Sequence, residues 1–248
     1  MMLAIYSLWL RDVIRFLRQP SRVIGALASP VLFWIVIGSG LGSSFTADGG
    51  GFLQYYFPGS LALIVLFTAI FSTISVIEDR QEGFLQGVLA SPAPRVAIVV
   101  GKSLGSTTLA ALNGGVFMLL LPWSGLAPGA FALLGTVAWV LLLGLALSGL
   151  GLVIAWPLRS TQGFHVIMNV VLVPLWLLSG ALFPAAGASP WIRAIMRVNP
   201  MTPAVDSLRA LLTGGSLSGV PAATLTVAGF AVVTLAVATL LVSRSSRT

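Results

Sequence analysis

Cysteine is absent from the 248 residues, histidine occurs once, and only 8% of the residues are charged. Without cysteine, the chain cannot form a disulfide framework, a thiolate zinc site or a cysteine nucleophile. One histidine and six acidic residues leave too few ligands for a metal cage, so we expect no metal site. Soluble domains carry about 25% charged residues, and disordered chains combine high charge with low hydrophobicity. The sequence fits neither class.

Hydrophobic residues are abundant: they make up 57% of the chain, and the mean hydropathy is +1.03. The formal net charge is +7, but the basic residues are scattered singly among long apolar runs. Such a distribution is typical of charge at a membrane surface and argues against a nucleic-acid partner. We therefore expect an all-α polytopic membrane protein in a lipid bilayer.

Uncharged stretches give the number of crossings, because a spanning helix needs about 20 largely apolar residues. Glycine and proline residues between 122 and 129 mark a turn that divides the longest stretch into two spans. The sequence predicts six transmembrane helices, at residues 23–43, 55–77, 103–122, 130–156, 164–184 and 219–242. An even number of spans places both termini on the same side of the membrane.

The distribution of lysine and arginine predicts which side that is. Ten basic residues belong to the termini and the loops on their side, whereas only Arg193, Arg197 and Arg209 lie on the opposite side. Cytoplasmic loops are enriched in lysine and arginine. We expect cytoplasmic termini and a location in the plasma membrane, of the bacterial inner-membrane type.

Residues 1–20 have the pattern of an amphipathic helix rather than of a signal peptide, because their charges do not precede the apolar residues. Four arginines fall within about 60° of one another on a helix: Arg11, Arg15, Arg18 and Arg22. Apolar residues occupy the opposite face, so the pattern predicts a helix lying in the cytoplasmic interface and ended by Pro20. An ordinary basic flank of the first span is the alternative.

Two apparent catalytic motifs do not meet their requirements. Gly101-Lys102-Ser103 ends like a phosphate-binding loop, but Val96 stands where that loop needs a glycine. We expect Lys102 to snorkel to the cytoplasmic mouth of its helix instead. Ser148 and His165 do not suit an intramembrane serine protease, because Ser148 lies deep in its span and His165 near a helix end. We assign no catalytic residue.

The predicted spans contain no acidic or basic residue, so a proton-coupled carrier is not favoured. Their strongest polar groups are Asn113 and Asn169, with Ser72, Thr73 and Ser75 on the second span. Hydrogen bonds between helices account for residues of this kind. If the protein moves a substrate, we expect the energy to enter from another subunit.

The segment between the second and third spans, residues 78–92, is the most unusual part of the sequence. Three of the six acids stand together in it, and a short apolar ridge follows them. This pattern favours a cytosolic helix that docks into a groove on a soluble partner, with its acids directed at basic groups there. The residues assigned to this contact are Glu78, Asp79, Arg80, Glu82, Gly83, Phe84, Leu85, Val88 and Leu89. A loop that packs on the membrane surface is the alternative.

The segment between the fifth and sixth spans, residues 185–215, is also apolar and regularly spaced. Its pattern predicts two short helices separated by a turn at Asn199, Pro200 and Pro203. Asp206 and Arg209 are three residues apart and can pair on one helix face. A segment this apolar is expected to dip back into the membrane under cover of protein.

These features together resemble the ABC-2 family of permeases, the six-helix membrane subunits of ATP-driven exporters related to daunorubicin-resistance permeases. The resemblance covers essentially the whole chain. Its most specific parts are Phe57-Pro58-Gly59, Glu78-Asp79-Arg80, Glu82-Gly83-Phe84-Leu85 with Pro92 and Arg95, Gly101-Lys102, Leu178-Ser179-Gly180-Ala181-Leu182-Phe183-Pro184, Asn199-Pro200, and Asp206-Ser207-Leu208-Arg209.

The resemblance implies a role for each unusual segment. Residues 1–20 would be the family's interfacial elbow, 78–92 its coupling helix, which contacts a separate ATPase subunit, and 185–215 its re-entrant extracellular element. Two permeases, as a homodimer or a heterodimer, would work with two ATPases. ATP and Mg²⁺ would then bind to the ATPase, with no cofactor in this chain, and the chain itself would not be an enzyme.

We interpret the chain as the permease subunit of an ABC exporter. The uncharged spans favour an amphipathic cargo that is drug-like, lipid-like or a glycan. Two alternatives are a membrane scaffold or assembly factor without transport activity, and a channel or secondary carrier. Only the exporter requires an ATPase partner, so an ATPase reading frame beside this one would distinguish it from both.

Overall fold

The computed structural model describes residues 1–41, 51–91 and 93–244, and for seven positions of the second helix it describes the backbone alone. Within these residues the regular structure is entirely helical. The helices are α1 (Met2–Leu17), α2 (Pro20–Leu41), α3 (Phe52–Ser72), α4 (Ser75–Gln81), α5 (Phe84–Ala90), α6 (Arg95–Met118), α7 (Leu121–Ser124), α8 (Ala130–Ala155), α9 (Thr161–Leu177), α10 (Pro190–Val198), α11 (Met201–Thr213) and α12 (Val220–Arg244), with a 3-10 turn at Ala185–Gly187.

Four helical stretches of the described residues are long and apolar enough to cross a membrane: α3 with α4, α6, α8 and α12. Helix α9 is shorter, with 17 residues, and the apolar stretch Pro30–Gly40 of α2 is also short. The chain is therefore a multi-pass membrane protein. The six predicted spans overlap α2, α3 with α4, α6, α8, α9 and α12. Residues 119–122 and 178–184 of these predictions extend beyond α6 and α9, and residues 42 and 43 lie outside the described part.

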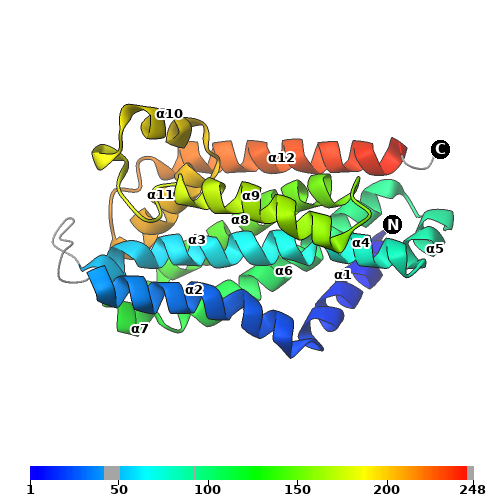
Figure 1. The fold of residues 1–248 in the computed structure, drawn as a ribbon, viewed down its shortest axis with the longest axis horizontal. Helices are drawn as coiled ribbons and strands as arrows, with labels where there is room; N and C mark the ends of the chain where they lie inside the picture. Colours follow the sequence, from blue (N-terminus) through cyan, green and yellow to red (C-terminus); the bar gives the residue numbers. More distant parts are fainter. Residues whose placement is uncertain (42–50, 92, 245–248) are drawn as a thin grey trace.

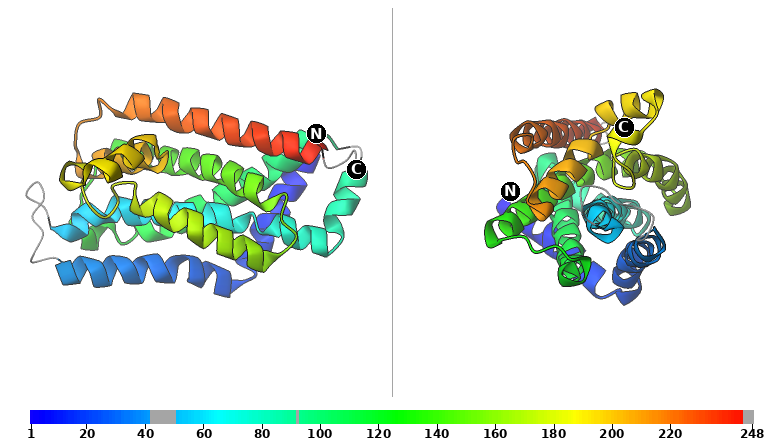
Figure 2. Two further views of the ribbon diagram at one scale, coloured as in Figure 1. Left: turned by 45° about the horizontal axis from the view of Figure 1, so that its top comes forward. Right: turned by 90° about the vertical axis from the view of Figure 1, so that its left-hand side faces the viewer.

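Helix α3 forms the centre of the bundle and packs against α2, α6, α8 and α11 (Figure 1). Most of its side chains are buried, and most of these are apolar. Helix α12 packs mainly on α8 and lies at the periphery (Figure 2). Large apolar side chains project outward from the outer helices, for example Phe33, Leu134, Val170 and Val232. Such a surface suits contact with lipid tails.

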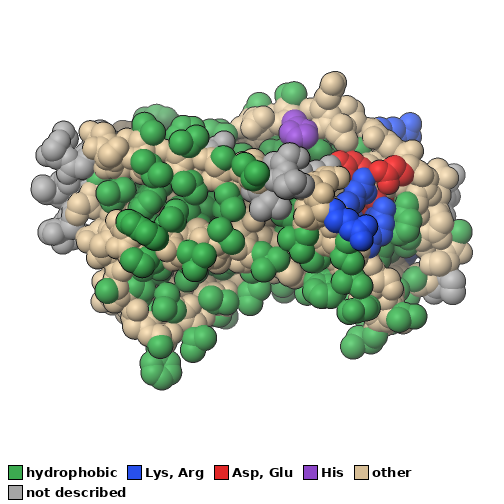
Figure 3. Space-filling view, turned by 90° about the horizontal axis from the view of Figure 1, so that it is seen from below, with side chains coloured by type: hydrophobic (Ala, Val, Ile, Leu, Met, Phe, Trp, Pro, Cys, Tyr) green, Lys and Arg blue, Asp and Glu red, His purple; other side chains and the backbone are tan. Residues whose placement is uncertain are grey.

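The two ends of the bundle differ. Helix α1 runs obliquely across one end, where α4, α5 and the end of α12 also lie, whereas α7, α10 and α11 lie at the other (Figure 1). On the face shown in Figure 3, lysine, arginine and acidic side chains gather toward the first end, and apolar side chains are spread over the rest of the face among other side chains and backbone. Below, the first end is called the α1 end and the second the α11 end.

Two predicted helix boundaries need correction. Helix α1 ends at Leu17, and Pro20 is the first residue of α2, so Pro20 begins a helix and does not end one. Proline is tolerated in the first helical turn because the N–H it lacks has no partner there. The predicted cytosolic helix at 78–92 is two helices: α4 continues α3, and α5 follows a break at Gly83. Pro92 lies outside the described residues.

Candidate functional site

The α1 end contains a buried ionic cluster where α1 and α4 meet α6. Lys102 of α6 is only 2% exposed. Its Nζ donates to Asp12 Oδ1 at 2.8 Å, to Ser75 Oγ at 3.2 Å and to Asp79 Oδ2 at 2.5 Å. Asp12 belongs to α1, and Ser75 and Asp79 belong to α4. One ammonium group thus uses all three of its hydrogen bonds to join three helices.

This geometry corrects the prediction that Lys102 snorkels to the cytoplasmic mouth of its helix. The side chain points into the protein because α1 covers it. Close approach of α1 depends on two glycines of α6: a Cβ at Gly101 would lie 2.9 Å from Leu8 Cβ, and one at Gly105 would lie 3.2 Å from Asp12 Cβ. The missing side chains let α1 lie directly on α6.

Asp79 also binds two arginines of α1. Arg11 Nη1 lies 2.6 Å and Arg15 Nη1 3.0 Å from Asp79 Oδ1. Arg15 Nη2 further contacts Glu82 Oε1 at 2.6 Å and Glu78 Oε2 at 3.4 Å. The three acids were expected to face basic groups of a partner, but in the structure they pair with α1 of their own chain. The sequence missed this because α1 and α4 are separated by α2 and α3.

The cluster affects the ionisation of Asp12, which lies on α1 outside the membrane-spanning helices. Burial raises the pKa of the Asp12 carboxyl, and the neighbouring Lys102 ammonium opposes this shift only in part. The other predicted arginines differ from Arg11 and Arg15. Arg18 is exposed, and Arg22 lies in the first turn of α2, where the structure describes only the backbone. The predicted arginine face therefore contributes Arg11 and Arg15 to the cluster.

Helix α5 begins after Gly83, whose φ of 77° is readily adopted only by glycine. Leu85 is buried, and Val88 and Leu89 pack beside it on the apolar cluster of the α1 end. Phe84 is 37% exposed, and the guanidinium carbon of Arg11 lies 3.7 Å from the centre of its ring. The predicted apolar ridge is thus divided: Leu85 faces the bundle, and Phe84 faces outward.

Arg80 belongs to the same segment but points elsewhere. Its guanidinium donates to the carbonyl oxygens of Trp156 at 2.7 Å and Leu158 at 2.8 Å. These carbonyls follow the end of α8 and have no intrahelical donor. Arg80 therefore fastens the α8–α9 connection to α4, which is a structural role inside the chain.

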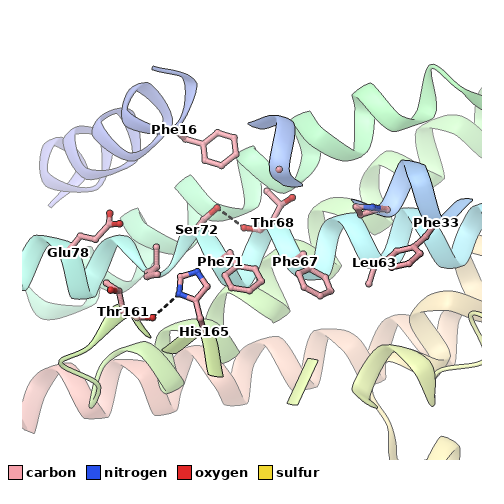
Figure 4. A pocket seen from close by; sticks show the side chains of 13 residues that line it. Phe16, Phe33, Leu63, Phe67, Thr68, Phe71, Ser72, Glu78, Thr161 and His165 are labelled. Carbon is pink, nitrogen blue, oxygen red and sulfur yellow. Dashed lines mark hydrogen bonds between the residues drawn. The ribbon is translucent and has the colours of Figure 1, made fainter. Parts of the chain in front are cut away.

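A cavity of about 530 Å³ lies between α2, α3 and α9. Aromatic and aliphatic side chains dominate its wall, with polar groups toward the α1 end (Figure 4). His165 Nδ1 lies 2.8 Å from the carbonyl oxygen of Thr161, which can only accept, so Nδ1 donates. Residues that line the cavity include Phe33, Leu63, Phe67, Phe71, Ser72 and His165.

At the α11 end, Asn199 joins α9 to α11. Its Nδ2 donates to the carbonyl oxygens of Leu175 at 2.7 Å and Leu178 at 2.8 Å, and its Oδ1 accepts from the backbone N–H of Met201 at 2.9 Å. Pro200 directly precedes α11. The two predicted short helices are present as α10 and α11, and α11 packs on α3, α8 and α12.

The predicted pair of Asp206 and Arg209 is confirmed, with Arg209 Nη1 at 3.2 Å from Asp206 Oδ1. Arg209 Nη2 also donates to the carbonyl oxygen of Gly180 at 2.8 Å, and its guanidinium carbon lies 4.2 Å from the ring centre of Tyr55. Tyr55 donates its hydroxyl to the same carbonyl at 3.0 Å. Arg209 therefore ties α11 to α3 and to the loop after α9.

The sequence profile of the ABC-2 type transporter family matches residues 4–213, most of the chain. The protein belongs to the ABC-2 type transporter family. Nodulation protein J of Rhizobium leguminosarum bv. viciae is 26% identical over 221 residues, which cover 86% of this chain and 84% of that protein. The daunorubicin resistance ABC transporter permease DrrB1 of Streptomyces coeruleorubidus is 26% identical over 213 residues, 84% of this chain and 74% of that permease. The probable multidrug ABC transporter permease YbhR of Escherichia coli K12 is 26% identical over 145 residues, 58% of this chain and 39% of that protein.

Permeases of the ABC-2 family are membrane subunits of transporters and carry no ATPase site of their own, and membership of the family implies association with an ABC ATPase subunit and with the membrane. In the part of the chain that the structure describes, no group of histidine and acidic side chains could hold a metal ion. The ionic cluster of this ABC-2 permease joins α1, α4 and α6.

Sequence reasoning missed Asp12 and misjudged Lys102, the two central residues of the cluster. A usable signal was present. Gly101 and Gly105, four residues apart on one face of α6, are typical of a close helix contact, and Lys102 adjoins that face. The first helix also contains an acid, Asp12, which lies about 100° from Arg11 and beside the apolar residues Leu8 and Ile5. An acid there is unnecessary for a helix that only binds an anionic membrane surface.

Proposed function

We propose that this permease forms one membrane half of an ATP-driven exporter that crosses the membrane six times with cytoplasmic termini. Two copies, or one copy and a similar permease, would pair with two ATPases. The observation that carries the proposal is α5, a short helix at the cation-rich end of the bundle. It directs Phe84 outward and rests on the bundle through Leu85. Such a helix can dock into a groove on a soluble subunit.

The cavity between α2, α3 and α9 is where we propose that cargo binds. Its volume of about 530 Å³ lies within the range of small-molecule sites, about 300–1,000 Å³. Its aromatic wall and its polar groups at one end suit an amphipathic drug-like or lipid-like molecule better than a glycan. The names of two relatives, a daunorubicin resistance permease and a probable multidrug permease, agree with such a cargo.

Reconstitution tests the proposed function. The permease and its co-purifying ATPase would be placed in liposomes and supplied with a fluorescent amphipathic drug and ATP. We expect ATP-dependent movement of the drug, which liposomes that contain the ATPase alone should not show. If the two proteins co-purify and ATP is hydrolysed but neither drug-like nor lipid-like cargo moves, the exporter assignment fails and the scaffold alternative is favoured.

The proposed topology can be measured by cysteine labelling, because the natural chain has no cysteine to give a background signal. Ser91 lies after α5 and Ser216 between α11 and α12, and both are exposed. In intact cells, a membrane-impermeant maleimide should label Ser216→Cys at once and Ser91→Cys only after permeabilisation. The opposite pattern would reverse the orientation, and equal labelling would contradict the six-span arrangement.

A further inference from the structure

The ionic cluster of the α1 end is more costly than a simple helix contact requires. Lys102, Asp79 and Asp12 are 2%, 0% and 7% exposed, although only 8% of the chain is charged at all. Burying charges is unfavourable unless partners and hydrogen bonds compensate, and well-packed apolar side chains often serve stability equally well. Buried charges near a membrane therefore indicate a function beyond stability.

The cluster extends from α6 to α5 through directly contacting side chains. Lys102 binds Asp79, Asp79 binds Arg11 at 2.6 Å, and the guanidinium of Arg11 lies over the ring of Phe84 at 3.7 Å. Asp12 joins the same ammonium to α1. A side chain inside α6 is thus connected to the outward-facing aromatic residue of α5 by three successive contacts.

The break at Gly83 matters because the backbone alone does not hold α5 rigidly to α4. Between α4 and α5 the chain passes through a glycine in the left-handed conformation, and a Cβ there would meet nothing within 4 Å. Backbone continuity alone would let α5 pivot around Gly83. The contacts of Arg11 and the packing of Leu85 bypass this pivot, because they hold α5 to α1 and to the bundle directly.

We propose that Lys102 is a positioning residue that clamps α1, α4–α5 and α6 into one unit, so that a displacement of α5 is passed to α6 and α1. The clamp would convert movement of the docking helix into movement of membrane helices. This inference rests on the proposed function for its transport readout, whereas its structural readout is independent of transport.

The decisive variant keeps the buried charge balanced. Lys102→Met alone leaves the buried carboxylates of Asp12 and Asp79 without the ammonium between them. If this single variant did not fold, the result would not test the clamp. In Lys102→Met/Asp12→Asn one positive and one negative charge are removed together, and Asp79 retains Arg11 and Arg15. We expect this double variant to insert and to bind the ATPase. Transport per ATP hydrolysed should fall at least about fivefold, the lower end of typical coupling between sites.

A distance measurement tests the clamp without transport. Spin labels would be attached to cysteines at Gln86 on α5 and Leu104 on α6, both exposed positions. We expect a narrow distance distribution in the parent protein and a broad one in Lys102→Met/Asp12→Asn. An unchanged narrow distribution overturns the clamp, even if the parent protein moves no cargo. A parent protein that moves no cargo would instead contradict the proposed function.

Arg11→Gln provides a variant that should fold even if the double variant does not, because Arg11 lies at the outer side of the cluster with 28% of its side chain exposed. Its matched control is Arg18→Gln, which changes an exposed arginine that directly follows the last residue of α1. Arg11→Gln should broaden the distribution of distances between the spin labels on α5 and α6, and it should lower transport per ATP hydrolysed. Arg18→Gln should change neither quantity. Equal behaviour of the two variants would remove the inferred link.

Discussion

Replacing Asp79 with leucine should nearly abolish the recovery of folded permease. The carboxylate is completely buried and compensates Lys102, Arg11 and Arg15 at once. Leucine leaves the buried ammonium of Lys102 with a single carboxylate partner, Asp12, and withdraws the carboxylate from both arginines. Removing one partner from a buried ionic group costs about 3–5 kcal/mol. The measurement is the fraction of protein that remains monodisperse in mild detergent after heating.

Asp206→Leu is the matched control, because it removes the same charge from the opposite end of the bundle. The side chain of Asp206 is 61% exposed and pairs with Arg209. Surface pairs of this kind contribute about 0–1 kcal/mol. Burial still raises the pKa of the Asp206 carboxyl, which limits the stability that its charged form can add. If Asp79→Leu survives heating as well as Asp206→Leu does, the ionic cluster does not hold the α1 end together.

Much of the fold follows from local patterns in the sequence. Stretches without charge predicted the helices that became α3, α6, α8, α9 and α12, because a membrane span must be apolar over its whole length. The amphipathic spacing of the first residues predicted α1, and the three-residue spacing of Asp206 and Arg209 predicted their contact. In each case the interacting residues lie within one helix or one uninterrupted stretch.

The functional geometry depends on residues far apart in the chain, and local patterns do not give their partners. Asp12 and Lys102 are ninety positions apart. A lysine near the end of an apolar helix normally extends to water; here α1 lies over it because Gly101 and Gly105 have no side chains to prevent this. The cavity between α2, α3 and α9 was not predicted, since its wall combines residues from these helices with Phe16 of α1 and Glu78 of α4.

The division of the apolar ridge could not be predicted either. Phe84 and Leu85 are adjacent in sequence, and helical spacing alone does not say which one faces the protein. The left-handed residue Gly83 sets the direction of α5 and thereby turns Leu85 inward and Phe84 outward. Of these two residues, Phe84 is exposed and Leu85 is buried, whereas the sequence assigned both to the partner.

Replacing Phe84 with alanine should weaken ATPase association about tenfold and leave the permease folded. Fully burying a phenylalanine side chain contributes about 1.5–3 kcal/mol. Because Arg11 already covers part of the ring, we expect the lower end of that range, and 1.4 kcal/mol corresponds to about tenfold in affinity. The measurement is ATPase binding to detergent-solubilised permease, with thermal stability measured on the same samples.

Two alanine variants separate docking from folding. Leu85→Ala removes a buried side chain and should cost about 2–5 kcal/mol of stability, so its lowered affinity should be accompanied by lowered thermal stability. Phe131→Ala removes a phenylalanine that is 92% exposed on α8 and should change neither quantity. A Phe84→Ala permease that binds the ATPase and couples ATP hydrolysis to transport at the parent rate would show that α5 is not the docking helix. The ATPase would then have to dock on another surface of the permease, because the outward direction of Phe84 is the observation that assigns docking to α5.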